Sequence, residues 1–416
     1  MTSRRLARAL ALRGLSALAR SIPSRAAPAI PERVLLVRPD HLGDVLLASP
    51  AFRLARLMLP KAHLAALVGP WSEAVAARSA ALDRVLTCEF PAFTRRPKPD
   101  PAQPYRLLAE TARWLRRERF DLAVSLRPDD WWSAALLALA GIPVRVGCDD
   151  PLARPFLTRA IAPLETHVAE LNLRLVASAT DAKPTTVDQA RALGLEWRVC
   201  ERERELANQL VTERGLGTAE QRQQPIATSA ESSLQPDHPI RAGLPSALPD
   251  SRLPLIAIHP GSGGNVKLWA STGWIAVGRW LEERGYDVAV TGSAAEADLC
   301  RPIAAGIPGA VDLGGATSIG ELAAFFERCR LVLGVDSGPL HLATAVGTPT
   351  VRLYGPSDPR RFGPYGDPAR HLLVQSRWRC VPCHVLEYPP DTVAYHACVR
   401  TVTPEDVIRQ IERVLE

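Results

Sequence analysis

The sequence is poor in lysine and aromatic residues, and it has no long apolar run. Of its 50 basic residues only four are lysines, at Lys61, Lys98, Lys183 and Lys267. No stretch of about 18 consecutive apolar residues occurs, which argues against an ordinary membrane-spanning helix. Eight cysteines in 416 residues do not indicate a disulfide framework. A secretory signal is also lacking, so we expect a cytoplasmic protein.

The net charge of +6 belongs to the N-terminal tail. Residues 1–31 contain six arginines and no acidic residue, whereas the rest of the chain has 44 residues of each sign. The rest therefore offers no basic face for nucleic acid. Arginine alternates with alanine and leucine over residues 1–22, which predicts a basic amphipathic helix. An anionic membrane surface, a transit peptide and a solvated tail all remain open for it.

Short apolar strands alternate with helical segments in two halves, which predicts parallel α/β sheets. Strands are expected at Val34–Arg38, His63–Gly69, Arg84–Cys88, Asp121–Arg127, Val144–Gly147, Leu255–His259, Asp287–Thr291, Val311–Leu313, Leu331–Val335 and Pro349–Leu353. Residues 216–252 are rich in Gln, Ser, Pro, Ala and Thr and predict a linker or insertion. An exposed, charged helix is expected before it, at Glu201–Arg214.

These patterns divide the chain into five parts. The two large parts are Rossmann-like domains, and ligands of such sheets bind at the carboxyl ends of the strands. The C-terminal helix begins at a Thr-Pro-Glu-Asp start signal, and packing back onto the first domain is one arrangement open to it. The parts are a basic tail (1–31), a first domain (32–200), a linker or insertion (201–252), a second domain (253–402) and a C-terminal helix (403–416).

The first chemical motif follows the first strand and reads Arg38-Pro-Asp40-His-Leu-Gly43-Asp44. Asp44 is expected in the first turn of the next helix, where the helix dipole favours an ionised carboxylate. An ionised carboxylate in a cleft can act as a general base. Asp40 and Asp44 could equally do no more than stabilise a helix N-terminus.

The second motif is a glycine-rich loop after the strand Leu255–His259, and it runs from His259 to Lys267. Glycines let backbone N–H groups approach phosphate oxygens, and Lys267 supplies a point charge. The third motif, Asp336-Ser337-Gly338-Pro-Leu-His341, joins a buried strand to a helix whose N-terminus can bind an anion. A helix cap and a buried core histidine are the plainer interpretation of this motif.

Together the three motifs resemble glycosyltransferase family 9, the ADP-heptose:lipopolysaccharide heptosyltransferases. The resemblance covers residues 33–180 and 253–415 and includes Trp269 after the glycine loop. It implies the GT-B fold, an α/β architecture of two facing Rossmann-like domains with a central cleft. It also implies an ADP-linked sugar donor, with no cofactor or metal required.

The resemblance assigns roles to individual residues. Asp44 matches the general base of an inverting transfer, and Arg38, Asp40 and Gly43 complete its motif. The expected donor-binding residues are Gly261, Ser262, Gly263, Lys267, Glu296, Asp336, Ser337, Gly338 and His341. No motif identifies the acceptor surface, for which Arg127 and Arg145 are considered.

Cysteines near the C-terminus form a separate cluster. Cys380 and Cys383 have C-x-x-C spacing, and Cys398 follows downstream. Such a set can bind zinc in a tetrahedral site, although free thiols are the plainer interpretation.

The sequence thus predicts a cytoplasmic glycosyltransferase that moves a heptose from an ADP-sugar to a lipopolysaccharide-core or other cell-envelope acceptor. A lipid-linked acceptor would place it at the cytoplasmic face of the inner membrane. A nucleotide-sugar epimerase of the same shape and a silent nucleotide-sugar-binding protein remain alternatives. A nicotinamide dehydrogenase is disfavoured, because neither half contains G-x-G-x-x-G.

Overall fold

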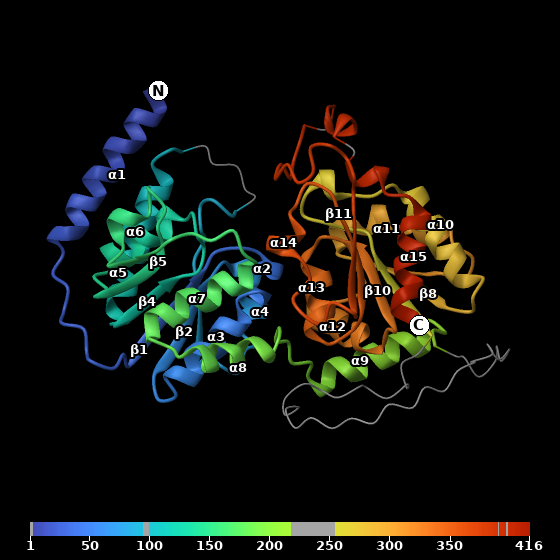
Figure 1. Cartoon of the computed structure of the whole chain (residues 1–416), viewed down its shortest axis with the longest axis horizontal. Coiled ribbons are helices and arrows are strands. Elements are labelled where there is room, and N and C mark those ends of the chain that lie inside the picture. Colours follow the sequence, from blue (N-terminus) through green and yellow to red (C-terminus); the bar gives the residue numbers. More distant parts are fainter. Residues whose placement is uncertain (1–2, 95–99, 218–253, 390, 397) are drawn as a thin grey trace. The chain divides into compact units, whose positions relative to one another are not determined.

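The chain folds into two compact units, Met1–Trp197 and Arg198–Glu416 (Figure 1). The computed structural model describes residues 3–94, 100–217, 254–389, 391–396 and 398–416. Each unit contains a six-stranded sheet in which every strand pair is parallel. Counted within its own unit, each sheet has the order 3-2-1-4-5-6, which is the Rossmann arrangement. The predicted α/β, Rossmann-like architecture is confirmed.

The first sheet has the order β3-β2-β1-β4-β5-β6. Its central strands are buried apolar runs, as expected where helices cover both faces. The strands are β1 (Arg33–Arg38), β2 (His63–Val68), β3 (Arg84–Thr87), β4 (Leu122–Ser125), β5 (Val144–Cys148) and β6 (Arg159–Ile161). The helices are α1 (Ser3–Ser21), α2 (Leu42–Leu46), α3 (Ser49–Met58), α4 (Glu73–Ala76), α5 (Gln103–Arg117), α6 (Trp131–Leu139), α7 (Val168–Thr180) and α8 (Pro184–Ala192).

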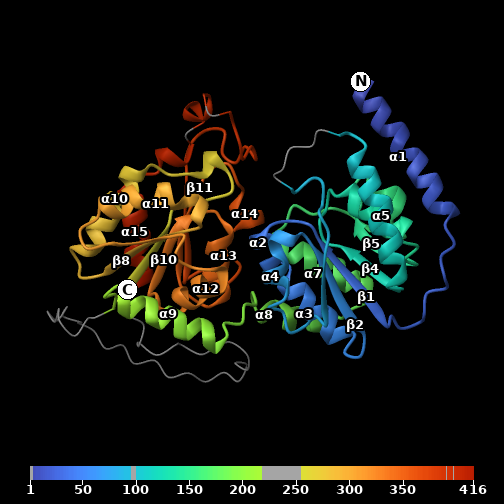
Figure 2. The ribbon, with the colours of Figure 1, turned by 180° about the vertical axis from the view of Figure 1, so that it is seen from behind.

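Alternate residues of β1 face opposite sides of this sheet, because strand side chains have a period of two. Leu35 and Val37 belong to one buried cluster with residues of α5 and α6. Helices α3, α7 and α8 contact one another in a separate group. The sheet therefore lies between two helical layers (Figures 1 and 2).

The C-terminal half of α1 is docked on the first unit. Helix α1 contacts α6 and the short helix η2 (Arg154–Phe156). Leu12 is buried in the same cluster as α6, and Ser16 Oγ donates to the carbonyl oxygen of Pro155 at 3.4 Å. Arg13 and Arg20 stay exposed. This part of the predicted tail is thus a packed helix with a basic outer side.

The second sheet has the order β12-β11-β10-β7-β8-β9. Helices α10, α11 and α15 contribute to one buried cluster with β7, β8, β10 and β11. The strands are β7 (Leu255–His259), β8 (Asp287–Gly292), β9 (Val311–Gly314), β10 (Leu331–Val335), β11 (Thr350–Tyr354) and β12 (His371–Gln375). The helices are α9 (Glu201–Glu213), α10 (Ser271–Glu282), α11 (Ala297–Ala305), α12 (Ile319–Arg328), α13 (Gly338–Ala345), α14 (Pro359–Phe362) and α15 (Pro404–Leu415).

The structure shows where two helices at the predicted division points pack. Helix α9, which we assigned to the linker 201–252, packs on α12 in the second unit and pairs Arg204 with Glu327 at 2.9 Å. Helix α15 packs within the second unit, where Val407 and Ile411 lie in the buried cluster beside α10. In both cases the buried side of the helix packs against a helix of the second unit, α12 for α9 and α10 for α15. Residues 218–252 of the predicted insertion lie outside the described residues.

Within the described residues, no helix is both long enough and apolar enough to cross a bilayer.

The docking of α1 predicts a difference between two of its leucines. Leu12 is 7% exposed and Leu18 is 55% exposed. Leu12→Asp places a charge in an apolar contact and should release the helix, because burying a leucine is worth about 1.5–3 kcal/mol. We expect trypsin to cut after Arg13 and Arg20 at least about tenfold faster in Leu12→Asp than in the wild type. Leu18→Asp is the matched control, and equal cleavage of the two variants would contradict the docking.

Candidate active site

The first polar cluster lies where β1 and β4 end, at the point where the strand order of the first sheet reverses. Arg38 is the last residue of β1, and its side chain is only 1% exposed. Its Nη1 donates to the carbonyl oxygen of Leu126 at 2.8 Å, and its Nη2 donates to Asp44 Oδ1 at 3.0 Å. Nη1 also lies 3.4 Å from the Oδ1 of Asn172 on α7. A guanidinium held by three elements is a rigid positive centre.

Asp40 is buried between two arginines. Its Oδ2 lies 2.9 Å from Arg38 Nε, in an ion pair whose angle does not suit a hydrogen bond. Its Oδ1 accepts a hydrogen bond from Arg127, which follows β4. Its backbone carbonyl accepts from Trp71 Nε1 and from Ser72 Oγ, both at 3.0 Å. The turn after β1 is therefore fixed by its own side chains and by the neighbouring β2 loop.

Asp44 is partly accessible to solvent, with 28% of its side chain exposed. It lies in the first turn of α2, one residue after Gly43. Burial of the carboxyl group, and then the charge of Asp40, raise its pKa to about 6, although Arg38 and Arg127 oppose the shift. A carboxyl group with a pKa near 6 is ionised at neutral pH and basic enough to accept a proton.

The second polar cluster lies where β7 and β10 end, at the corresponding point of the second sheet. Lys267, in the short helix η4 (Asn265–Lys267), places Nζ 2.6 Å from Asp336 Oδ2. Asp336 follows β10, and the same Oδ2 accepts from Ser357 Oγ at 2.5 Å. Ser262 Oγ donates to the Asp336 carbonyl oxygen at 3.3 Å. Loops after β7, β10 and β11 thus meet around Asp336.

The glycine loop is closely fitted to Glu296. Glu296 ends the short helix η5 (Ala294–Glu296) and caps it, because its Oε2 accepts from Ser293 N at 2.8 Å and from Ser293 Oγ at 2.7 Å. A Cβ atom on Gly261 would lie 2.1 Å from Glu296 Oε1. Only glycine leaves room for this carboxylate, which therefore lies at the edge of the loop. Gly263, by contrast, is exposed.

The third motif begins helix α13. Ser337 is its N-cap and Gly338 its first residue. The Oγ of Ser337 is buried, and no described residue hydrogen-bonds to it. His341 is buried one turn further, with Nδ1 3.3 Å from Nη1 of the fully buried Arg352. The free N–H groups at this helix start, together with those of the glycine loop, can hold an anion.

Comparison with known proteins decides the family. The model described as glycosyltransferase family 9 (heptosyltransferase) matches residues 108–389, which is more than half of the chain. The chain belongs to this family. It is 23% identical over 398 residues to lipopolysaccharide heptosyltransferase 2 of Salmonella typhimurium, a match that covers 92% of this chain and 98% of that protein.

Solved structures share the fold of this glycosyltransferase. A glycosyl transferase family 9 structure from Veillonella parvula has a TM-score of 0.68 and 22% identity, and the match covers 94% of this chain and 99% of that one. An Escherichia coli heptosyltransferase with ADP has a TM-score of 0.61 and 19% identity, over 92% and 99% of the two chains.

The sequence analysis did not single out several residues of the two clusters, among them Asn172, Ser357, Arg352 and Asn265. Ser357 and Arg352 lie on or just after β11, and Asn265 lies inside the glycine loop. A sequence signal existed for Arg352, since a lone arginine in the apolar strand Thr350–Tyr354 needs buried partners. Of the two arginines considered for the acceptor, Arg127 joins the first cluster, whereas Arg145 donates to the backbone of Phe156 at 2.7 Å.

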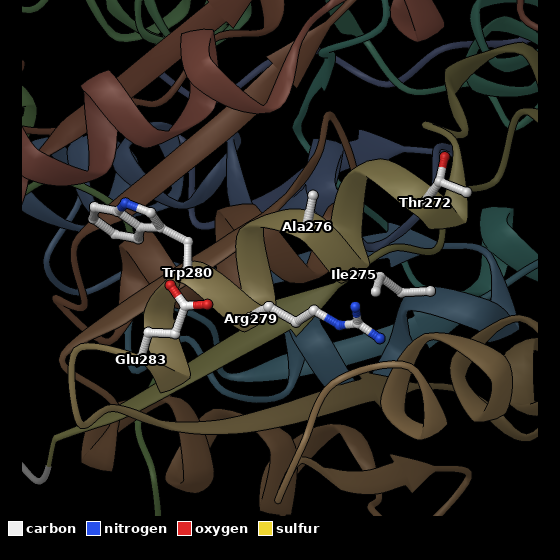
Figure 3. A pocket seen from close by; sticks show the side chains of 6 residues that line it. All are labelled: Thr272, Ile275, Ala276, Arg279, Trp280 and Glu283. Atoms are coloured by element: carbon white, nitrogen blue, oxygen red, sulfur yellow. The ribbon is translucent and has the colours of Figure 1, made fainter.

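Two other features lie apart from these clusters. A surface pocket is lined by side chains of α10 and the residue after it, and it shares no residue with either cluster (Figure 3). The cysteines Cys380, Cys383 and Cys398 are free thiols. No group of three or more His, Cys, Asp or Glu side chains in the described part of the chain is placed to hold a metal ion.

The contact between Gly261 and Glu296 predicts a non-additive pair of substitutions. Gly261→Ala should destabilise the protein by about 1–3 kcal/mol, because the added methyl group overlaps the carboxylate. In the Glu296→Ala background the same change should cost less than half as much. Urea unfolding of the four proteins measures this coupling. Equal costs in both backgrounds would show that the carboxylate does not limit the loop.

Proposed function

We propose that this glycosyltransferase moves a heptose from an ADP-linked donor to a lipopolysaccharide-core or other cell-envelope glycan, with inversion at the anomeric carbon. The observation that carries the proposal is Asp44, a partly exposed carboxylate with a pKa of about 6, held by Arg38 at the switch point of a Rossmann sheet. The name of the Salmonella typhimurium relative and the ADP in the Escherichia coli structure support the choice of substrates.

In the proposed reaction Asp44 removes the proton from an acceptor hydroxyl. The hydroxyl oxygen bonds to the anomeric carbon as the bond from that carbon to the phosphate oxygen breaks, and ADP leaves with the electron pair. Backbone N–H groups of the glycine loop and of the start of α13, together with Lys267, stabilise the charge that develops on the phosphate. Gly261, Ser262, Gly263, Asp336, Ser337, Gly338 and His341 complete the proposed donor site, and Glu296 is proposed to lie at the ribose. This chemistry needs no cofactor.

A lipid-linked acceptor would bring the enzyme to the cytoplasmic face of the inner membrane. The docked helix α1 supports such peripheral contact, because Arg13 and Arg20 are exposed and residues 1–31 hold no acidic side chain. Arginines on an amphipathic helix are attracted to anionic lipid headgroups.

Transfer from ADP-heptose to a lipopolysaccharide-core acceptor lacking that heptose tests the proposal. We expect Asp44→Asn to lower kcat by about 10²–10⁴-fold, because the proton acceptor is lost. Its affinity for ADP should be unchanged, since the proposed donor residues lie in the other unit. Asp188→Asn, an exposed carboxylate on α8, is the matched control. Unchanged turnover in Asp44→Asn would remove Asp44 from the mechanism, and release of free sugar without acceptor would favour an epimerase.

The raised pKa of Asp44 predicts the acidic limb of the pH profile. A base must be ionised, so kcat/KM should rise with pH, with an apparent pKa near 6, and then level off. Asp40→Asn removes the nearby negative charge and leaves both arginines, so the limb should move to lower pH. Because the pKa of Asp44 in the folded protein lies above its ordinary value of 3.8, ionisation of Asp44 costs stability as pH rises from about 4 to 6. Asp44→Asn should escape that loss, which thermal unfolding at pH 5 and pH 7 measures.

A further inference from the structure

An irregular segment near the C-terminus, His384–Tyr388, is bonded to two loops of the second polar cluster; we call it the strap. It lies between β12 and the short helix η6 (Val393–Tyr395) and has no helix or strand of its own. Two fixed contacts, one near each end, determine its course.

The first contact joins the strap to the loop after β11. The backbone N–H of His384 donates to the carbonyl oxygen of Pro356 at 2.8 Å. The next residue in that loop is Ser357, whose hydroxyl donates to Asp336. One loop therefore holds both the start of the strap and the central carboxylate of the cluster.

The second contact joins the strap to the glycine loop. Asn265 Nδ2 donates to the carbonyl oxygen of Tyr388 at 2.7 Å, and the N–H of Tyr388 donates to Asn265 Oδ1 at 3.2 Å. These two hydrogen bonds join residues that are 123 positions apart in the sequence. Beside it, a Cβ atom on Gly264 would lie 2.6 Å from the carbonyl oxygen of Leu386. The Tyr388 ring also stacks on His396, with 3.4 Å between ring centroids.

The sheet order shows what lies between the two loops. Strand β10 lies between β11 and β7, and it leads directly into Asp336 and Ser337. Ser357, next to the first anchor, and Lys267, two residues after the second, both contact Asp336. The strap therefore connects two loops that meet at the end of β10, where the anion site is proposed.

We infer that the strap is the outer wall of the donor site, and that Asn265 is a positioning residue which holds the glycine loop against it for a nucleoside diphosphate. This inference rests on the proposed function. Val385 and Leu386, between the two contacts, are about 40% exposed. Apolar side chains beside a phosphate site limit the access of water and so strengthen its electrostatic contacts.

Asn265→Ala removes both side-chain hydrogen bonds and leaves the loop backbone in place. Because these two bonds hold the loop that would bind the phosphates, we expect the dissociation constant for ADP and the donor KM to rise about tenfold. The value of kcat should fall less than about threefold, because Asn265 does not touch the reacting atoms. Asn208→Ala, an exposed asparagine on α9, is the control and should behave as the wild type.

Hydrogen exchange supplies a readout that needs no variant. ADP should slow amide exchange across residues 384–388 in the wild type, and Asn265→Ala should remove most of that protection. Binding of UDP is measured in parallel. Equal nucleotide affinity in Asn265→Ala and the wild type, or no protection of the strap by a bound nucleotide, would overturn the inference. If the wild type binds UDP but not ADP, the proposed ADP-linked donor is wrong. Protection of residues 384–388 by UDP then tests the role of the strap. If it binds neither nucleotide, both proposals fall.

Discussion

All strands of a parallel sheet deliver their carboxyl ends to one edge, and this constraint brings the polar residues of each unit together. Arg38 and Arg127 are 89 positions apart yet both flank Asp40, because β1 and β4 are neighbours. Lys267 and Asp336 meet because β7 and β10 are neighbours. The strand order reverses at these two pairs, which is the place where ligands of open α/β sheets generally bind.

In both clusters the basic side chains are paired with carboxylates. Arg38 and Arg127 face Asp40 and Asp44 in the first unit, and Lys267 faces Asp336 in the second. Such compensation is expected, because an unpaired charge away from water is costly. In the proposed function, attraction of a diphosphate would therefore depend more on backbone N–H groups than on unpaired side-chain charge. An incoming phosphate would also compete with Asp336 for Lys267.

The sequence predicted ten of the twelve strands, and the two that it missed have physical reasons. Both β6 and β12 are edge strands: β6 is three residues long and half-exposed, and β12 alternates buried and exposed positions. The motifs correctly indicated which residues end β1, β7 and β10. Partners from other segments, such as Ser357, Tyr388 and Arg352, could not be paired from a single sequence. The packing of α9 on α12 was not predicted, because only Glu203, Ala207 and Val211 of this highly charged helix are buried.

Helix α9 has a practical consequence for dividing this chain. Because the low-complexity stretch ends near residue 252, an expression fragment of the second unit would ordinarily be designed to start at β7. Such a fragment would lack α9, which packs on α12, and would remove the ion pair between Arg204 and Glu327. An excised second unit that keeps its native surface must begin no later than Cys200, the N-cap of α9. The natural cutting point therefore lies beside Trp197 and Arg198, well before the low-complexity stretch.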